Sequence, residues 1–326
     1  MLYDIAVIGD CVQDIFILAP SKIIKEKKDI KYLAYSYGDK ISIDKLNYDL
    51  GGSACNAAVG MRKLGIKTTM ISILGDDILS RGIIEELKKK GVGTSFLIKQ
   101  KNNDIGISFI LLGQDRDRTI LTHRPNNNYK KINLRKVFIF SKGFYVAGIN
   151  KYSKIILRNV FKYISKSKKP LFMNPSIYQI EHDLSMLKKL ISKTKILTLN
   201  VEEAQKILKI KKGSGIKNLL KKLKKLGAET IMITDSVKGS YIYDGKSFYR
   251  AGLYPAKRLD ATGAGDSSSA TFIAMYKKGY NIEECLKFAA VNSASVVSVY
   301  GAQKGLLGEK EIIKRFGKNK VSIRKF

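Results

Sequence analysis

The sequence is poor in the residues that build disulfide frameworks and zinc sites. It has three cysteines, Cys11, Cys55 and Cys285, which are widely spaced and form no CxxC pair. An odd number of distant cysteines argues against a disulfide framework and favours a reducing, cytoplasmic environment. With only two histidines, His123 and His182, the chain is also a poor candidate for a histidine-rich metal site.

Proline is scarce, and no Pro/Gly-rich linker, internal repeat or low-complexity tail divides the 326 residues. No apolar stretch approaches the length of a membrane-spanning helix. The first apolar run, residues 5–8, has acids on both sides, so we expect a buried strand and not a signal peptide. With 44% hydrophobic and 27% charged residues, the composition predicts one globular domain over residues 1–326.

Acidic residues are outnumbered: 28 Asp and Glu stand against 60 Lys and Arg, for a net charge of +32. The lysines are spread along the whole chain, and in residues 219–226 they lie opposite a leucine face. No helix-turn-helix, RNP-like aromatic pattern or zinc knuckle accompanies them. We therefore interpret them as solvated surface, which attracts anionic ligands in a salt-dependent way, and regard nucleic-acid binding as the less favoured alternative.

Apolar runs of strand length alternate with helical patterns. The expected strands are residues 5–8, 69–74, 106–112, 144–147, 171–174, 196–200 and 230–234. The expected helices are residues 56–64, 80–90, 154–165, 202–208, 216–226, 266–278 and 282–299. This alternation predicts an α/β protein whose mainly parallel sheet has helices on both faces.

One segment imitates a phosphate-binding P-loop. In residues 239–247 five residues separate two glycines where the P-loop has four, and a P-loop must open a helix. The segment instead predicts two strands joined by a type I′ turn at Asp244-Gly245.

The most informative segment is residues 259–266, Leu-Asp-Ala-Thr-Gly-Ala-Gly-Asp, which leads into a helical pattern. The small residues Gly263, Ala264 and Gly265 let a ligand approach backbone N–H groups that have no partner within the helix, which predicts an anion site. Asp266 follows at once, and a carboxylate beside a bound phosphate suggests a general base. Backbone amides that hold a phosphoryl group next to such a base are typical of small-molecule kinases.

Residues 260–266 resemble the C-terminal signature of the ribokinase-like, or PfkB-type, carbohydrate kinases, and the resemblance extends from Gly9 to Gly301. It implies a three-layer α/β/α fold with a small β-sheet lid, whose strands are inserted at about residues 11–50 and 96–122. The latter stretch is expected to form two strands joined at residues 113–115. The resemblance also implies ATP as phosphoryl donor, Mg²⁺, and transfer to a primary hydroxymethyl group of a small sugar, ribose-like or fructose-like, with Asp266 as base.

A second pattern, residues 50–60, resembles the N-terminal signature of the family and implies that Gly52 and Asn56 contact substrate hydroxyls. The resemblance also implies that Asp14 binds sugar hydroxyls. An ionised carboxylate accepts two hydrogen bonds and so selects against analogues that lack a hydroxyl. Arg124, after the expected lid strand, either contacts the substrate or lies in solvent.

Residues 200–203, Asn-Val-Glu-Glu, resemble the family element that orders the water shell of Mg²⁺. The resemblance gives this role to Asn200 and, through water, to Glu203, and oxygen ligands suit a hard cation that keeps its waters. The same pair would also make a helix N-cap with Glu203 at the third position, so a purely structural role stays open.

The remaining resemblances concern the nucleotide. Thr234, Ser236 and Gly239 fall in a segment like the family's nucleotide loop, and Asn292 resembles a residue beside the adenine. Asp260 corresponds to an acid that helps relatives hold a monovalent cation, so activation by K⁺ stays open.

Several alternatives remain at this stage. Ser53 stands where ribokinases often have lysine, which weakens the ribose assignment, so an adenosine-like nucleoside is the second candidate substrate. A non-catalytic basic binding protein on the same fold is the third candidate. Asp10 is interpreted as a turn residue at the end of the first strand. The family resemblance also allows a homodimer formed through the lid.

Overall fold

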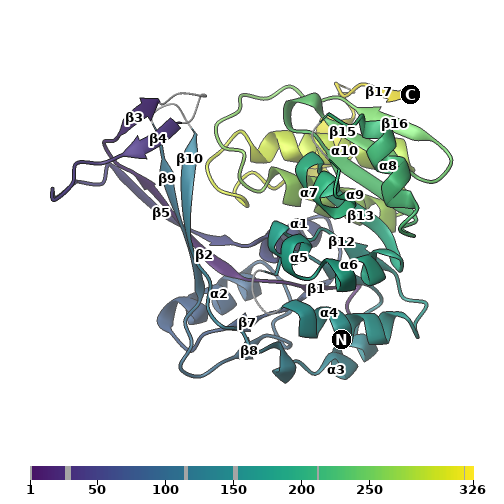
Figure 1. Cartoon of the computed structure of the whole chain (residues 1–326), viewed down its shortest axis with the longest axis horizontal. Coiled ribbons are helices and arrows are strands. Elements are labelled where there is room, and N and C mark those ends of the chain that lie inside the picture. Colours follow the sequence, from purple (N-terminus) through teal and green to yellow (C-terminus); the bar gives the residue numbers. More distant parts are fainter. Residues whose placement is uncertain (1, 26–30, 114–116, 150–152, 211–212, 319) are drawn as a thin grey trace.

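A large sheet of apolar strands forms the main body of the molecule (Figure 1). The computed structural model describes residues 2–25, 31–113, 117–149, 153–210, 213–318 and 320–326. In these ranges nine strands pair in the order β17-β16-β15-β14-β13-β12-β11-β1-β6. The strands from β14 to β6 are parallel, and β15, β16 and β17 are antiparallel. Their bounds are β1 Ile5–Ile8, β6 Thr68–Ile71, β11 Phe144–Val146, β12 Leu171–Met173, β13 Thr194–Asn200, β14 Thr230–Thr234, β15 Ser240–Tyr243, β16 Phe248–Ala251 and β17 Ile323–Lys325.

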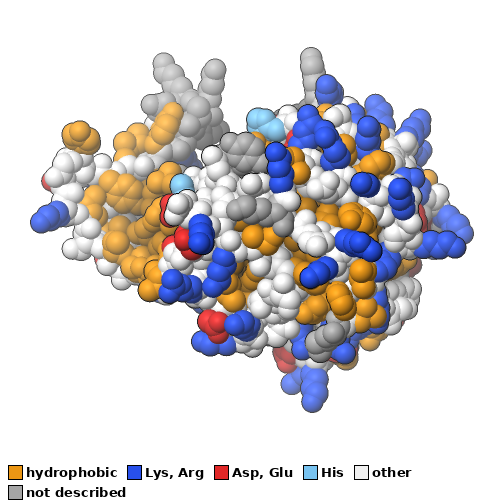
Figure 2. All heavy atoms as spheres, turned by 90° about the horizontal axis from the view of Figure 1, so that it is seen from below, with side chains coloured by type: hydrophobic (Ala, Val, Ile, Leu, Met, Phe, Trp, Pro, Cys, Tyr) orange, Lys and Arg blue, Asp and Glu red, His pale blue; other side chains and the backbone are white. Residues whose placement is uncertain are grey.

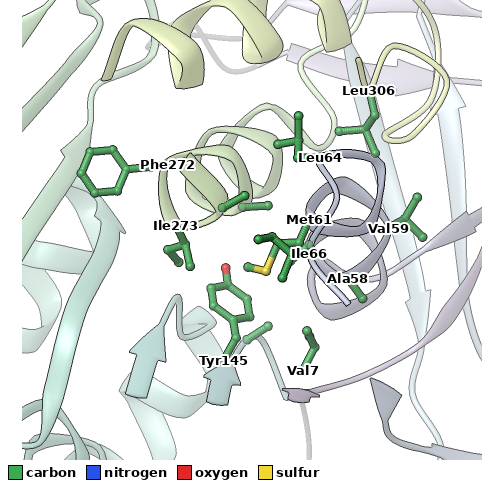
Figure 3. Close-up of a cluster of buried hydrophobic side chains, with 14 of the residues drawn as sticks. Val7, Ala58, Val59, Met61, Leu64, Ile66, Tyr145, Phe272, Ile273 and Leu306 are labelled. Carbon is green, nitrogen blue, oxygen red and sulfur yellow. The ribbon is translucent and has the colours of Figure 1, made fainter. Parts of the chain in front are cut away.

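Helices cover both faces of this sheet, which is why its parallel strands are continuous apolar runs. Successive side chains of β1 point to opposite faces, so Val7 joins one buried cluster and Ala6 and Ile8 join the other. Figure 3 shows the first cluster, where Tyr145 from the sheet packs among Met61 and Ile273. The helices on this side are α1 Ser53–Lys63, α2 Ile78–Lys89, α9 Ala264–Lys277, α10 Ile282–Val296 and α11 Glu309–Phe316. Those on the other side are α3 Leu134–Ile139, α4 Ser153–Ile164, α5 Ile177–His182, α6 Leu184–Ile191, α7 Val201–Leu208 and α8 Ile216–Lys224.

A second sheet of four strands rises from one side of the body (Figure 1). We call it the lid; its strands pair in the order β10-β9-β2-β5. Their bounds are β2 Val12–Leu18, β5 Lys45–Gly51, β9 Gly106–Leu112 and β10 Arg118–His123. A hairpin of β3 Lys22–Lys25 and β4 Lys31–Ala34 lies near its tip. The chain passes from β1 through three residues into β2, so the lid is joined directly to β1, the strand next to β6 at one edge of the main sheet.

The predicted alternation of strands and helices is confirmed, with differences that have local causes. The expected strand 69–74 is split into β6 and β7 (Ile73–Leu74), and β7 pairs with β8 (Ile98–Lys99). The short helices α3, α5, α6 and α11 were not predicted, because with 6 to 8 residues each they barely complete two turns.

Two predicted turns have different outcomes. The hairpin of β15 and β16 is present, but its loop has four residues and not the two of a type I′ turn. The Asp244 carboxylate closes this loop by accepting hydrogen bonds from the backbone N–H groups of Lys246 and Ser247, each at 2.7 Å. The lid strands β9 and β10 pair as expected, while two residues of their predicted connection at 113–115, residues 114 and 115, lie outside the described residues.

Lys and Arg side chains are scattered over the face seen in Figure 2 and do not gather in one patch. In the described ranges, no helix combines the length and the hydropathy needed to cross a membrane.

Candidate active site

The N-terminus of α9 has the backbone geometry predicted for an anion site. Gly263, its N-cap, has φ +77°, and a Cβ there would lie 2.5 Å from the Cβ of Ala302, so only glycine fits. The N–H groups of Ala264, Gly265 and Asp266 fall in the first turn, where an α-helix offers them no acceptor. The N–H of Ala264 donates to the carbonyl oxygen of Ala261 at 3.3 Å. A Cβ on Gly265 would meet no atom within 4 Å, so the start of the helix is open beside this residue and an anion can approach it.

Asp266 is held in place beside these amides. The Asn56 Nδ2 of α1 donates to Asp266 Oδ2 at 2.8 Å, and Asn56 Oδ1 accepts from Gln303 Nε2 at 3.0 Å. Gln303 therefore fixes which way the amide of Asn56 points, although sequence reasoning did not single it out. Burial raises the pKa of Asp266, and the hydrogen bond from Asn56 opposes this shift. The structure thus places a fixed carboxylate of raised basicity next to an anion site.

A cavity of about 350 Å³ separates the lid from the main body and ends at Asp266. Cross-strand pairing places Asp14, Ser108 and Thr122 in one row on the inner face of the lid. Arg124 also lines the cavity, and its Nη1 donates to the carbonyl of Ile107 at 2.7 Å. Further lining residues are Asp10, Val12, Gly52, Ser53, Asn56, Ile110, Ile120, Gly148, Ser176, Thr262 and Gly263. The residues predicted to bind substrate, Asp14, Gly52, Asn56 and Arg124, therefore share one cavity.

Asp14 is a buried carboxylate whose charged form is disfavoured. Burial raises its pKa to about 6, and the charges of Asp49 and Asp266 add to the shift. A hydrogen bond from Ser108 and the guanidinium of Arg124 work in the opposite direction. A ligand that supplies two hydroxyl donors would restore part of the solvation that this carboxylate has lost.

Asp10 was expected to be a simple turn residue, but the structure places it in the wall of the lid cavity. It is 7% exposed, lines the same cavity and accepts a hydrogen bond from the hydroxyl of Tyr129. Gly52, with φ +93°, comes so close that a Cβ would lie 2.5 Å from the carbonyl oxygen of Asp10. This contact fixes the start of α1, and hence Asn56, against the end of β1.

A smaller cavity of about 200 Å³ adjoins the other side of Asp266 and Gly265. Asn200 and Glu203 line it and form a capping box at the start of α7, with both hydrogen bonds at 2.8 Å. The structural role considered for this pair is thus present, and both side chains also face the cavity. Burial raises the pKa of Glu203 to about 7, and the charge of Asp266 contributes.

The donor set of this cavity suits a hydrated cation better than a directly bound one. In the described part of the chain, His, Cys, Asp and Glu side chains nowhere gather in groups of three or more that could hold a metal. A Mg²⁺ ion beside Glu203 would therefore take its other ligands from phosphate oxygens and water, which this small, hard ion readily keeps.

A third cavity, of about 370 Å³, continues from Gly265 along α9 and α10. Thr234, Ser236 and Gly239, the residues predicted to form the nucleotide loop, line it. Asn292 does not reach it: the side chain is fully buried, donates to Thr271 Oγ1 at 2.7 Å and accepts from the N–H of Leu307 at 2.9 Å. The expectation that Asn292 lies beside the adenine is therefore wrong in position. Its helix neighbour Ser293 lines the cavity instead.

The three cavities meet at one point. Gly263 and Asp266 line the first two, and Thr234 and Gly265 line the second and the third. A ligand in the lid cavity and a ligand in the third cavity would thus approach each other at the amides of α9.

Comparisons with known proteins match most of the chain. The model of the pfkB family carbohydrate kinases matches residues 4–307. The chain is 25% identical over 277 residues to a 5-dehydro-2-deoxygluconokinase of Bacillus velezensis, covering 81% of this chain and 84% of that protein. It is 24% identical over 277 residues to a nucleoside kinase of Methanocaldococcus jannaschii, covering 83% and 86%.

Solved structures of kinases share the fold. Arabidopsis thaliana ribokinase complexed with ribose and ATP matches with a TM-score of 0.79 and 23% identity, over 96% of this chain and 98% of that one. The likeness confirms the ribokinase-like fold predicted from the sequence. Since the family model spans most of the chain, this protein belongs to the pfkB family of carbohydrate kinases, enzymes that use ATP.

Proposed function

We propose that this kinase transfers the γ-phosphoryl group of ATP to a primary hydroxymethyl group of a small, neutral sugar. The meeting of three cavities at the amides of α9, with Asp266 between them, carries this proposal. The sugar occupies the lid cavity, the phosphates lie at the smaller cavity, and the adenosine lies in the third cavity.

Asp266 acts as the general base. Its carboxylate takes the proton of the sugar hydroxyl as the hydroxyl oxygen attacks the γ-phosphorus, and the bond from that phosphorus to the bridging oxygen of ADP breaks. The N–H groups of Ala264, Gly265 and Asp266 stabilise the negative charge that develops on the transferred group. Glu203 would hold Mg²⁺ through water, and the bound ion would supply positive charge to neutralise the phosphates. The lid excludes water, which limits hydrolysis of ATP.

The charge of the lid cavity supports a neutral substrate. Asp10, Asp14 and Asp266 face it, whereas Arg124 is its one cationic lining residue among those described. The guanidinium of Arg124 already donates to two backbone carbonyls and to Ser108 Oγ. Its Nε is buried without a hydrogen-bond partner, but the three carboxylates outnumber this one cation. A substrate carboxylate or phosphate would therefore meet net negative charge. Hydroxyl groups instead find acceptors at the carboxylates.

A nucleoside is the second candidate substrate. The next row of the lid, above Asp14, presents Phe16, Ile110 and Ile120, and both isoleucines line the cavity. Such an apolar surface would suit a nucleobase.

The test is ATP consumption with Mg²⁺ against a panel of neutral pentoses and hexoses, sugar acids and nucleosides. We expect stimulation by a neutral sugar. Stimulation by nucleosides alone would replace the sugar with the second candidate, and stimulation by sugar acids alone would contradict the charge argument. If no compound stimulates turnover, the catalytic proposal fails in favour of a basic binding protein on this fold, for which salt-sensitive RNA binding is the measurement.

Replacing Glu203 with glutamine is expected to raise the Mg²⁺ concentration needed for half-maximal rate by about tenfold, because second-shell partners typically contribute 10–100-fold. Glutamine keeps the size and the capping geometry but loses the charge. Titration of the rate with Mg²⁺ at saturating ATP measures the effect, and Glu202→Gln on the exposed side of α7 is the matched control. An unchanged Mg²⁺ requirement would reduce Glu203 to its capping role.

We propose that the outer face of the lid forms a homodimer. Leu46 and Tyr48 of β5 and Leu121 of β10 are 45%, 58% and 54% exposed on this face. Figure 2 shows hydrophobic side chains gathered toward the lid side of the molecule. Light scattering should give twice the mass of the chain, and Tyr48→Asp should halve it. The same change at the exposed Tyr37, as Tyr37→Asp, is the control. A wild-type monomer at all concentrations would exclude the dimer.

A further inference from the structure

Arg118 lies on the inner face of the lid, at its upper end. Alternate residues of one strand face the same side, and Ile120, Thr122 and Arg124 all line the sugar cavity. Arg118 continues this series two residues beyond Ile120. Across the sheet it lies in one row with Leu112, Leu18 and Lys45.

From this position Arg118 reaches the main body at Asp260. Its Nη1 lies 4.0 Å from Asp260 Oδ1, and the side chain of Asp260 is only 2% exposed. The Nε of Arg118 is itself buried and has no hydrogen-bond partner in the structure. A buried carboxylate needs a compensating charge, and this guanidinium supplies it from the lid.

Asp260 in turn organises the segment before the anion site. Its Oδ1 accepts from the N–H of Thr262 at 2.9 Å and from Thr262 Oγ1 at 2.7 Å, and its Oδ2 accepts from the N–H of Gly301 at 3.1 Å. Thr262 precedes Gly263, the N-cap of α9, so the carboxylate sets the approach of the chain to the phosphate-binding amides.

Two further contacts hold the lid against the segment that follows α10. Lys304 Nζ lies 3.6 Å from Asp49 Oδ2 on β5, and Lys45 Nζ lies 5.8 Å from the centre of the Tyr300 ring. These contacts involve the same sheet face as Arg118, since Asp49 pairs with Asp14 and Lys45 with Leu18.

The surroundings of Asp260 do not fit a monovalent cation as its partner. Three donors already bond to its two oxygens, and the guanidinium of Arg118 lies 4.0 Å from Oδ1 on the side of the lid. This differs from the K⁺ activation that the resemblance left open.

We propose that Arg118 is a positioning residue that couples closure of the lid to the anion site. Its guanidinium takes the place of a monovalent cation at Asp260 and so keeps Thr262 and the α9 amides in the geometry that receives the γ-phosphate. The expected effect of Arg118 on turnover rests on the proposed kinase activity. Its expected effect on the structure around Thr262 does not depend on that activity.

The experiment compares wild type with Arg118→Gln, Arg118→Lys and the control Arg81→Gln on the exposed face of α2. Wild-type kcat should be equal in K⁺ and Na⁺ buffers. Arg118→Gln should lower kcat by roughly 10–100-fold, because a small misplacement of binding groups has effects of this size. Millimolar guanidinium should restore part of the loss, and Arg118→Lys, which keeps the charge, should retain more activity than Arg118→Gln.

A readout without turnover separates this inference from the proposed function. Hydrogen exchange at the Thr262 amide should be faster in Arg118→Gln than in wild type or Arg81→Gln, whether or not any sugar is phosphorylated. Unchanged exchange together with unchanged kcat would overturn the inference, as would a wild-type enzyme that requires K⁺. If wild type turns over no compound of the panel, the proposed function fails, while the exchange rates still decide the role of Arg118.

Discussion

Replacing Asp266 with asparagine is expected to lower kcat by about 10²–10⁴, the contribution of a general base, with little change in ATP affinity. Asparagine keeps the size of the side chain, and its carbonyl oxygen can still accept the 2.8 Å hydrogen bond from Asn56 Nδ2. The amides of α9 also remain. Only the ability to take a proton is lost, so the effect falls on kcat.

The stability of Asp266→Asn should not fall. Burial raises the pKa of Asp266, so its ionised form destabilises the folded protein, and this cost grows as the pH rises through the raised pKa. Removing the charge should therefore leave the melting temperature at pH 8 equal or higher. The measurements are single-turnover rates, ATP binding and thermal unfolding, with Asp39→Asn at an exposed position as control. A variant with near-normal turnover would remove Asp266 from the mechanism.

The parts of the site that sequence predicted best are those whose chemistry is local. Gly263, Gly265 and Asp266 lie within four residues, and a helix start with small residues determines an anion site by its own backbone. Asn200 and Glu203 are likewise three residues apart in one capping box. In such segments the residue types and their spacing are enough.

The parts that sequence missed depend on contacts between distant segments. Gln303 orients Asn56 across 247 residues, and the hydroxyl of Tyr129 meets Asp10 across 119. No local pattern marks either partner. Asn292 was misplaced for a different reason: adjacent helix residues point about 100° apart, so a one-residue error exchanges the buried side for the cavity side. Ser293 faces the cavity for this reason.

Replacing Asp14 with asparagine is expected to lower kcat/KM for the sugar by about 10²–10⁴, mostly through a higher KM. Two charge-assisted hydrogen bonds from substrate hydroxyls, at about 1.5–3 kcal/mol each, would give an effect of this size. The pKa of Asp14 is about 6, so wild-type sugar affinity should weaken as the pH falls below that value. In the variant this dependence should disappear. Calorimetric sugar binding between pH 5 and pH 8 measures both, with the exposed Asp44→Asn as control.

The same substitution should make the protein more stable. The pKa of Asp14 is raised from 3.8 to about 6 in the folded state, so its stability contribution is most favourable below pH 3.8 and is lost as the pH rises through 6. A shift of this size corresponds to roughly 2–3 kcal/mol at pH 8, which Asp14→Asn should recover in part. Urea unfolding at pH 8 and pH 4 checks this, since the difference between variant and wild type should shrink at the lower pH. A variant that binds sugar normally, or that is less stable at pH 8, would show that Asp14 supports the lid and does not bind substrate. Weaker sugar binding together with a more stable fold is the result expected when a buried carboxylate destabilises the protein and serves to bind its ligand.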